Sequence, residues 1–422
     1  MWVEQHMRQH MSLEPSPMTL DLPPPEPQRT RAFRLRGPLE RLRRRLRGLG
    51  EVWWRVRAKR AQAANCGAFI AVTGSCGKTT TTLLIERLLA ATGSRVAGGR
   101  NENHGRYLMK TMAGLREPVD FVVQEVSGHR PGAIADVTDH LKIDVAVVTV
   151  IGHDHNAAFG VTYNAAPDAI AAEKGRLVAA LSSDGIACLN ADDPRVAAMA
   201  ARTSARIVTY GRAEGADLRA VNVDGRWPGR LRFDLLVEGR MMPVSTRFVG
   251  TIMLPNVLAA LAAVHALGRD LALAIAALSG VEPEPRHMSI VEGASGRTYV
   301  LDTFKAPLWS TMLLAQDLAE IGGDGTLFVL GDMSDLRNGN TKRYVGVMQR
   351  AAAIVDRVIL TVGATCAERR ARQDGLENVA AAADHAAVAS LIASSPERLV
   401  ILKSNKTGQL DKVVGLVESG DR

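Results

Sequence analysis

The chain has 422 residues, of which 46% are hydrophobic, so it is long enough for two or three domains with their own cores. Its net charge of +8 lies at the N-terminal end, because residues 1–60 hold fourteen Lys/Arg and six Asp/Glu whereas the remainder holds 38 of each sign. The folded body is therefore predicted to be neutral, so the basic composition does not indicate a nucleic-acid groove in it.

Two further classes of protein are excluded by composition. No run of about 18 uncharged apolar residues occurs, so no membrane-spanning helix is expected, and the N-terminus lacks the apolar stretch of a secretory signal. The four cysteines, Cys66, Cys76, Cys188 and Cys366, form no CxxC pair, which excludes a zinc site built from cysteines and argues against a disulfide framework. We therefore expect a cytoplasmic protein.

Residues 1–64 are predicted to form a basic arm. Residues 1–37 are polar and rich in proline, a composition that favours disorder. From Leu39 to Val56, apolar residues recur at alternating spacings of three and four, which predicts an amphipathic helix with arginines over the rest of its surface. Two interpretations stay open: the helix packs against the body or a second copy of the chain, or it binds an anionic membrane surface or an acidic partner.

Residues 65–282 are predicted to form a central α/β domain. An apolar strand at 68–74 runs into a glycine-rich turn and a helix that begins at Lys78. Further strands are expected at 119–126, 143–150, 185–190 and 206–211, and their apolar runs are typical of parallel strands buried on both faces. A helix is expected at 162–181, an antiparallel appendage with DG and EG turns at 216–248, and two helices over 255–279.

Residues 283–422 are predicted to form a second α/β domain. Pro283 and Pro285 indicate a linker, after which the alternation of strands and helices restarts. Strands are expected at 298–302, 326–331, 357–363 and 398–403, with helices between them. This alternation implies a mostly parallel sheet with right-handed crossovers.

The segment AVTGSCGKTTTT, residues 71–82, has the features of a phosphate-binding loop. Gly74 and Gly77 allow a tight turn whose backbone N–H groups face a polyphosphate, and the N-terminus of the following helix adds its positive dipole end. Lys78 is expected to reach the β- and γ-phosphates and Thr79 to ligate Mg²⁺. A conventional Walker loop has glycine where this chain has Val72, so the loop is a shorter variant. A glycine turn followed by a surface lysine is the structural alternative.

The sequence TGSCGKTT at 73–80 resembles the TGTNGKTT loop of the Mur ligase family, which also includes folylpolyglutamate synthetases. The similarity in motif order covers about residues 68–410, and the members that add D-Ala-D-Ala in peptidoglycan synthesis look most similar. The resemblance implies an α/β fold with a P-loop ATPase domain and a Rossmann-like C-terminal domain. It also implies ATP and Mg²⁺, the latter at two sites. The nucleotide-binding residues implied are Gly74, Ser75, Cys76, Gly77, Lys78, Thr79, Thr80, Asn256, Arg286 and Asp302.

Glu125 and His155 match metal-binding segments of the family. Glu125 lies in the strand at 119–126, near whose carboxyl end an acidic group can hold Mg²⁺ between nucleotide phosphates. His155 precedes Phe159-Gly160 as the family's metal-site histidine does. The structural alternatives are a solvated glutamate at a strand end and a histidine that only donates hydrogen bonds.

Lys174 matches a lysine that is carbamylated in family members, where the carbamate binds the second Mg²⁺. Arg176 stands where the family often has an acidic residue, and an ordinary exposed helix lysine is the alternative. The resemblance thus implies Lys78, His155 and Lys174 as catalytic residues. It implies Thr79, Glu125, His155 and Lys174 as metal ligands.

Several segments depart from the family or have two interpretations. The UDP-binding domain of peptidoglycan ligases has no counterpart in the residues before the first strand, so a carboxylate that is not UDP-linked is expected. Lys305 replaces an Asn or His of the family and can pair with a phosphate or a substrate carboxylate. Asn190, Asp192 and Asp193 either shape the nucleotide pocket or cap a helix. Lys403, in ILKSN, matches a late strand end.

The main hypothesis is an ATP-dependent acid–amino-acid ligase that acts through an acyl phosphate. Two alternatives stay open: a P-loop NTPase or kinase that phosphorylates a small molecule, and a non-catalytic nucleotide-binding scaffold docked through the arm. The expected partners are small-molecule or peptide carboxylates and amines, without nucleic acid. A membrane surface, a protein or a second copy of the chain is a further candidate partner for the arm.

Overall fold

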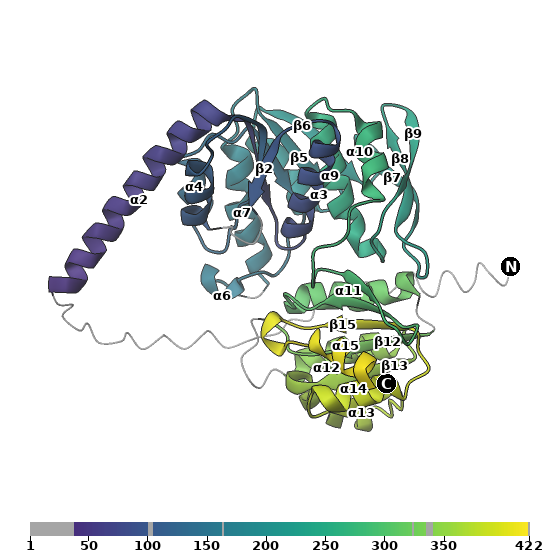
Figure 1. The fold of residues 1–422 in the computed structure, drawn as a ribbon. Helices are drawn as coiled ribbons and strands as arrows, with labels where there is room; N and C mark the ends of the chain where they lie inside the picture. Colours follow the sequence, from purple (N-terminus) through teal and green to yellow (C-terminus); the bar gives the residue numbers. More distant parts are fainter. Residues whose placement is uncertain (1–37, 100–103, 163, 323–324, 335–340, 421–422) are drawn as a thin grey trace.

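The computed structural model describes residues 38–99, 104–162, 164–322, 325–334 and 341–420. The disorder predicted for residues 1–37 lies outside this part of the chain. Within it, the strands form two sheets, one in each of the α/β bodies seen in Figure 1. The boundaries predicted at residues 64/65 and 282/283 stay a prediction.

The first sheet has nine strands in the described residues, in the order β2-β3-β1-β4-β5-β6-β7-β8-β9. Pairing is parallel from β2 to β7 and antiparallel from β7 to β9. Their bounds are β1 (Cys66–Thr73), β2 (Val96–Gly99), β3 (Val119–Glu125), β4 (Val145–Val148), β5 (Ile186–Asn190), β6 (Arg206–Gly211), β7 (Leu218–Asp224), β8 (Arg232–Val237) and β9 (Arg240–Ser245).

Helices cover both faces of this sheet, because the side chains of β1 divide between two cores. Ile70 and Val72 belong to the core shared with α3 and α9, whereas Phe69 and Ala71 belong to the core shared with α4 and α7. The helices of this part are α2 (Pro38–Asn65), α3 (Lys78–Ala91), α4 (Gly105–Ala113), α5 (Ala135–Thr138), α6 (Asn156–Phe159), α7 (Ala166–Ala179), α8 (Pro194–Ala197), η1 (Ala198–Arg202), η2 (Thr251–Met253), α9 (Leu254–Ala266) and α10 (Leu271–Leu278).

The second sheet has six strands in the described residues, ordered β10-β11-β15-β12-β13-β14, of which only β10 is antiparallel to its neighbour. The strands are β10 (Ser289–Glu292), β11 (Thr298–Asp302), β12 (Thr326–Leu330), β13 (Arg357–Thr361), β14 (Val379–Ala382) and β15 (Leu399–Lys403). The helices are α11 (Leu308–Ile321), α12 (Thr341–Ala352), η3 (Val362–Ala367), α13 (Glu368–Gln373), α14 (His385–Ala393), η4 (Lys406–Gly408) and α15 (Lys412–Gly420).

The predicted α/β class, with mostly parallel sheets, is confirmed. The antiparallel strands expected at 216–248 are present as β7, β8 and β9, and they extend the main sheet, because β7 pairs with β6 through Tyr210 and Leu218. Three strands were not predicted. β2 is short and ends in two glycines, β14 is mostly alanine, and β10 is half exposed, so none has the apolar run of the other strands.

Two arrangements of the fold bear on function. In the first sheet β1, β3 and β4 end together, since Val72 lies beside Glu125 and Thr73 beside Val148. In the second sheet Asp302 and Lys403 are partners at the ends of β11 and β15. Ligands of open α/β sheets bind at the carboxyl ends of strands. No helix among the described residues combines the length and apolarity needed to cross a bilayer.

Tyr210 provides a test of how the sheet is tied together. Its side chain is fully buried, and its hydroxyl donates a hydrogen bond of 2.8 Å to the carbonyl oxygen of Val148 on β4. We expect Tyr210→Phe to lower the free energy of unfolding by about 1 kcal/mol, because a buried acceptor loses its partner. Urea denaturation measures the difference. Tyr107→Phe, at a side chain that is 44% exposed, is the control and is expected to change little.

Candidate functional site

The glycine-rich loop between β1 and α3 has the shape of an anion cradle. Gly74 and Gly77 have φ angles of +148° and +81°, which residues with a Cβ rarely adopt. A Cβ at Gly77 would lie 2.0 Å from Oδ1 of Asn256, so the loop and the start of α9 approach closely. The first turn of α3 carries no acidic residue, which leaves its N–H groups free of a competing carboxylate.

The loop is held by the segment that follows β4. The backbone N–H of Ser75 donates to the carbonyl oxygen of Val150 at 2.8 Å, and the Ser75 hydroxyl bonds both the carbonyl and the N–H of Gly152 at 3.0 Å. The Thr149 hydroxyl donates to the carbonyl of Cys76 at 2.6 Å. Ser75 therefore supports the loop and Cys76 is exposed at its tip, while Thr80 is buried.

A cleft of about 540 Å³ lies against this loop and is lined from both sheets. The central part of the chain contributes loop and strand-end residues, and the C-terminal part contributes the ends of β11 and β15 and the loops after them. The lining residues used below are Ser75, Cys76, Gly77, Lys78, Thr79, Thr80, Glu125, Asp154, His155, Asn256, His287, Asp302, Phe304, Lys305, Lys403 and Lys406.

Three lysines and one aspartate interact electrostatically at the cleft. Lys78, Lys174 and Lys305 each act on the buried carboxyl of Asp154. Burial alone would raise the pKa of Asp154, but these cations and His155 hold that pKa below its usual value. No role could be assigned to Asp154 from the sequence, because it lies six residues beyond the end of β4 in a segment without a regular pattern.

The two buried lysines of this group are shifted toward their neutral forms. Burial is the main cause of the lowered pKa of Lys78, with the charge of Asp154 opposing it and that of Lys305 adding to it. The Lys78 ammonium donates to the carbonyl oxygen of Gly74 at 2.7 Å. Burial, followed by the charge of Lys78, lowers the pKa of Lys174 to about 7. Lys174 is 1% exposed, so the alternative of an ordinary surface lysine is wrong.

Lys174 is positioned by the glutamate that precedes it. The carboxylate of Glu173 accepts hydrogen bonds from the backbone N–H groups of Gly132 and Ile134, at 3.0 Å and 2.9 Å. These bonds fix α7 against the loop after β3. A Cβ at Gly128 of that loop would lie 3.1 Å from Cγ of Lys174, which shows how closely the loop packs on the lysine stem.

Glu125 and His155 both line the cleft, but from different strand ends. Glu125 ends β3 and is 1% exposed, so it is not a solvated strand-end residue. His155 has a left-handed φ of +54° and lies 3.4 Å from Asp154, measured between Nε2 and Oδ1. The rings of His129 and His155 have centroids 6.2 Å apart, and His104 stacks edge-on against His129 at 4.4 Å.

The C-terminal wall of the cleft is cationic and aromatic. The Lys403 ammonium donates to Asp302 and, at 2.9 Å, to the carbonyl oxygen of Lys305, so two strand ends and the following loop are joined. Lys305 itself is exposed to the cleft. Phe304 lies between the His287 ring, 4.7 Å away, and the Lys406 ammonium, 5.8 Å from the ring centroid.

Comparison with known proteins identifies the central region. Residues 72–264 match the model of the Mur ligase middle domain. This region of the chain is similar to the Mur ligase middle domain. The resemblance of the loop at 73–80 to that family is thereby confirmed.

The proteins similar to this chain include UDP-N-acetylmuramoyl-tripeptide–D-alanyl-D-alanine ligases. It is 28% identical to the UDP-N-acetylmuramoyl-tripeptide–D-alanyl-D-alanine ligase of Mycobacterium leprae over 70% of this chain and 61% of that protein. It is 31% identical to the protein of the same name from Mycobacterium bovis over 63% of this chain and 52% of that protein. The chain thus spans about half to three-fifths of these relatives.

Solved structures share the fold. The MurF structure from Acinetobacter baumannii superposes with a TM-score of 0.75 at 20% identity, covering 87% of this chain and 80% of that one. The MurF ligase of Thermotoga maritima, solved in complex with ADP, superposes with a TM-score of 0.72 at 20% identity, covering 87% and 83%.

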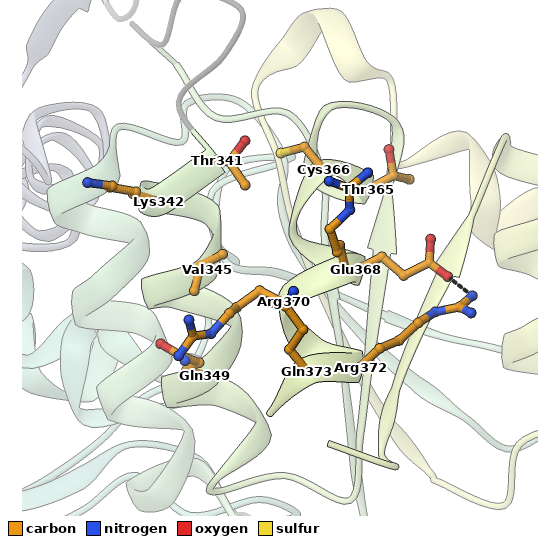
Figure 2. Close-up of a pocket in the computed structure, with 11 residues that line it drawn as sticks. Thr341, Lys342, Val345, Gln349, Thr365, Cys366, Glu368, Arg370, Arg372 and Gln373 are labelled. Carbon is orange, nitrogen blue, oxygen red and sulfur yellow. Dashed lines mark hydrogen bonds and ion pairs between the residues drawn. The ribbon is translucent and has the colours of Figure 1, made fainter. Parts of the chain in front are cut away.

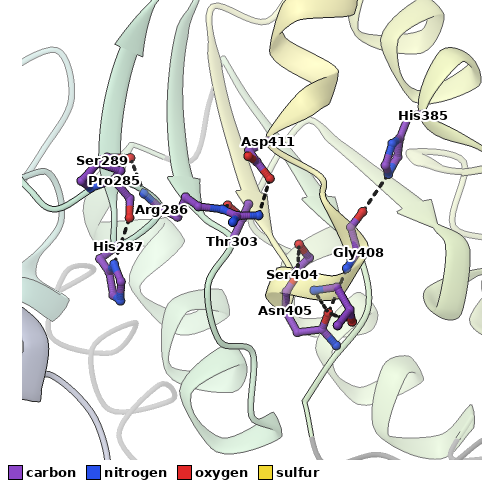
Figure 3. Close-up of polar contacts among 11 residues, drawn as sticks. Pro285, Arg286, His287, Ser289, Thr303, His385, Ser404, Asn405, Gly408 and Asp411 are labelled. Atoms are coloured by element: carbon purple, nitrogen blue, oxygen red, sulfur yellow. Dashed lines mark hydrogen bonds and ion pairs between the residues drawn. The ribbon is translucent and has the colours of Figure 1, made fainter. Parts of the chain in front are cut away.

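Arg286 is held by contacts within the C-terminal part of the chain. Its guanidinium donates to the Asp411 carboxylate at 2.7 Å, and its backbone N–H bonds the Ser289 hydroxyl, as Figure 3 shows. Arg286 is not among the residues that line the cleft. The Asp411 ion pair holds the side chain within the C-terminal domain, and the contact of Arg286 with a nucleotide stays a prediction.

The contacts of Asn190, Asp192 and Asp193 favour the structural interpretation. Asp193 caps α8 by accepting from the N–H groups of Arg195 and Val196, and its other oxygen accepts from Ile151. Asp192 accepts from the backbone after β6, and Asn190 donates to the carbonyl of Thr149. These residues shape loops near the cleft without lining it.

A second cavity, of about 950 Å³, lies in the C-terminal domain between α12, η3 and α13 (Figure 2). Its wall is basic, but Arg372 is paired with Glu368 and Arg370 with Asp374. None of the sequence-predicted site residues lines it. We assign no function to it.

The residues present fit a magnesium–nucleotide complex only if the nucleotide supplies ligands. Among the described residues, no three His, Cys, Asp or Glu side chains gather closely enough to hold a metal ion by themselves. The available groups at the cleft are the Thr79 hydroxyl and the Glu125, Asp154 and His155 side chains. Hydroxyl and carboxylate oxygens suit Mg²⁺, which usually keeps waters and binds substrate phosphates as well.

The burial of the Lys174 ammonium is expected to lower the free energy of unfolding in a way that depends on pH. Its pKa of about 7 in the folded state lies below the ordinary 10.5, so the unfolded chain binds more protons between these values and stability rises with pH there. The cost of burying the charge is fully present below pH 7. Lys174→Met is therefore expected to stabilise the fold by a few kcal/mol at pH 6 and by progressively less toward pH 10.

Thermal unfolding in buffers depleted of CO₂ measures this difference. Lys412→Met, on an exposed position of α15, is the matched control and is expected to show no such pH dependence. A stability difference for Lys174→Met that stays constant from pH 6 to pH 10 would contradict the shifted pKa.

Proposed function

We propose that the chain is an ATP-dependent ligase that joins a carboxylate to an amine through an acyl phosphate. The observation that carries this proposal is that Lys78, Lys305 and Asp154 line the cleft beside the glycine-rich loop, while the buried Lys174 also acts electrostatically on Asp154. Several cations beside a glycine-rich loop and a helix N-terminus suit a polyphosphate and a second anion together. The names of the relatives support the same class of reaction.

The proposed reaction has two steps. A carboxylate oxygen of the acid attacks the γ-phosphorus of ATP, the bond to the bridging oxygen breaks, and ADP leaves. The amine nitrogen then attacks the acyl carbon, phosphate leaves, and the amine gives up a proton. The loop N–H groups and Lys78 would hold the β- and γ-phosphates, and charge stabilisation with positioning supplies the rate.

Thr79, Glu125, Asp154 and His155 would hold Mg²⁺, which when bound would neutralise charge on the transferring phosphoryl group. Lys174 is the proposed site of carbamylation. An amine reacts with CO₂ in its neutral form, and the lowered pKa of about 7 makes that form abundant at neutral pH. The carbamate would replace a buried cation with an oxygen ligand for a second Mg²⁺.

Lys305 is the proposed contact for the substrate carboxylate. It comes from the C-terminal wall, is exposed to the cleft, and acts electrostatically on both Lys78 and Lys174. Asp302 is occupied by Lys403, which keeps the adjacent acid from neutralising Lys305. Phe304 and Lys406 flank the same wall and would face the nucleotide or the amine.

The test of the proposed function is the release of ADP with amino acids, peptides and carboxylic acids, together with mass detection of a condensed product. Free and UDP-linked acids are offered in parallel, because the expectation of an acid without UDP stays a prediction. Lys78→Ala is expected to lower product formation by about 100-fold or more without unfolding the protein. Lys412→Ala is the matched surface control.

The outcomes of this assay separate the rival functions. An amide product that needs Lys78 supports the ligase. A stable phosphorylated acid without amide would indicate a kinase. Nucleotide binding without turnover of any acid–amine pair would indicate a scaffold.

Lys305 gives a prediction about substrate affinity. We expect Lys305→Gln to raise KM for the carboxylate substrate by about tenfold and to leave KM for ATP nearly unchanged, because the lost cation pairs with a carboxylate. Lys305→Arg keeps the charge and is expected to retain most of the affinity. Steady-state kinetics with each substrate varied in turn measures both constants. An equal rise in KM for ATP would place Lys305 on the nucleotide instead.

A further inference from the structure

One helix of the molecule carries an apolar surface that nothing in the described residues covers. Val52, Trp53 and Val56 of α2 are 56%, 51% and 46% exposed. At about 100° per residue these three side chains share one face of the helix. The same spacing runs back through the sequence by way of Leu49 to Leu39. We call Val52, Trp53 and Val56 the outer face of α2.

The opposite face of α2 is the one that holds the helix to the body. Ala58 is fully buried and Trp54 packs on the core shared with α4. Arg57 donates to the carbonyl oxygen of Ala113 at 3.1 Å, and Asn65 donates to that of Leu115 at 3.0 Å. In Figure 1 the helix lies against the central domain at its C-terminal end and projects beyond the domain at its N-terminal end. The packing that the sequence left open therefore uses Trp54 and Ala58, and it does not use the outer face.

The charge of the helix indicates what covers the outer face. From Pro38 to Asn65 the sequence has nine Lys/Arg and two Asp/Glu, although residues 61–422 have equal numbers of both signs. Arg55, Lys59 and Arg60 are exposed beside the outer face. Apolar residues that include tryptophan, bordered by cations on a helix too polar to span a bilayer, are typical of helices that lie in the interface of an anionic membrane.

We propose that α2 docks on the surface of a bilayer that contains anionic phospholipids. The outer face enters the boundary between headgroups and acyl chains, with the Trp53 indole at the level where its ring and N–H are both accommodated. The arginines and Lys59 pair with lipid phosphates. Because α2 leads directly into β1 and the glycine-rich loop, docking of α2 holds the central domain next to the membrane. The cleft is lined by residues of other elements.

A second copy or a protein partner fits these observations less well. Helices that pair with a second copy usually carry acids and bases beside the apolar stripe, so that opposite charges meet across the interface, whereas α2 has nine Lys/Arg and only two Asp/Glu and two copies would repel. A partner protein would need an unusually acidic groove. An anionic membrane offers both an apolar layer of acyl chains and a high density of negatively charged headgroups.

The experiment measures binding of the full chain to vesicles by sedimentation and by tryptophan fluorescence. Vesicles of phosphatidylcholine with phosphatidylglycerol are expected to bind the protein about tenfold or more tightly than vesicles of phosphatidylcholine alone, with a blue shift of the emission. Raising the salt concentration is expected to weaken the binding, because exposed charges are screened.

Two variants separate the apolar and the charged contributions. Val52→Ser, Trp53→Ser and Val56→Ser combined are expected to lower vesicle affinity by about tenfold or more and to abolish the blue shift. Arg55→Gln with Lys59→Gln is expected to lower affinity for anionic vesicles and to reduce its salt dependence. The matched control is Met241→Ser with Leu273→Ser, which removes side chains that are 59% and 51% exposed elsewhere, and it is expected to bind like the parent.

Three results would overturn the proposal. They are equal binding to neutral and anionic vesicles, full binding by the variant with three serines, and dimerisation that depends on Trp53 without any vesicle binding. Thermal unfolding and nucleotide binding are measured on every variant, so loss of vesicle binding is interpreted only for chains that are folded.

Discussion

The site depends on positive charge placed where water is largely excluded. Lys78 and Lys174 are buried, Lys305 acts on both, and one carboxylate, that of Asp154, lies among them. Burial of a cation is costly unless an anion compensates it, so Lys78 and Lys174 have lowered pKa values. In the proposed function, a polyphosphate and a substrate carboxylate would supply the compensating negative charge. The positive charge that destabilises the fold would then bind these anions and stabilise a transferring phosphoryl group.

The two sheets make this arrangement by directing their strand ends toward the same cleft. The central sheet supplies the glycine-rich loop, Glu125 and the segment after β4, and the C-terminal sheet supplies the Asp302–Lys403 pair and the loop with Lys305. One hydrophobic cluster continues from the central domain into the C-terminal domain. The hydroxyl of Thr251 also donates to Asp317 at 2.5 Å across the two parts. The cleft is therefore an assembled feature, and neither sheet contains it alone.

The helix α2 and the cleft use positive charge in different ways. In the cleft the cations are buried and few, so each one acts strongly over a short distance. On α2 they are exposed and numerous, so each one acts weakly and is screened by salt, while an extended anionic surface can engage many of them at once. Residues 61–422 have no net charge, so the rest of the chain adds little to the electrostatic field at the cleft or at α2.

The class of fold, the position of the glycine-rich loop and most strands of both sheets could be predicted from the sequence alone. These features are local: an apolar run, a turn that needs glycine and a following helix specify one another over about a dozen residues. The resemblance of short motifs to a known family also indicated Glu125, His155 and Lys174 as site residues. The sequence did not predict β2, β10 or β14, because short strands rich in glycine or alanine are stabilised by their neighbours and carry little apolar pattern of their own.

Which charged groups lie close together could be seen only in the folded chain. Asp154 has a place beside Lys78 and Lys174 because β1, β4 and α7 pack together, and that proximity has no signature in the sequence. Arg286 pairs with Asp411, 125 residues away, and so stays out of the cleft that its motif predicted. The outer face of α2 was likewise visible as a stripe in the sequence, but only packing showed that the body binds the opposite face. Pairing between distant charges and the choice of a buried face both depend on contacts that form when the chain folds, and local sequence does not encode them.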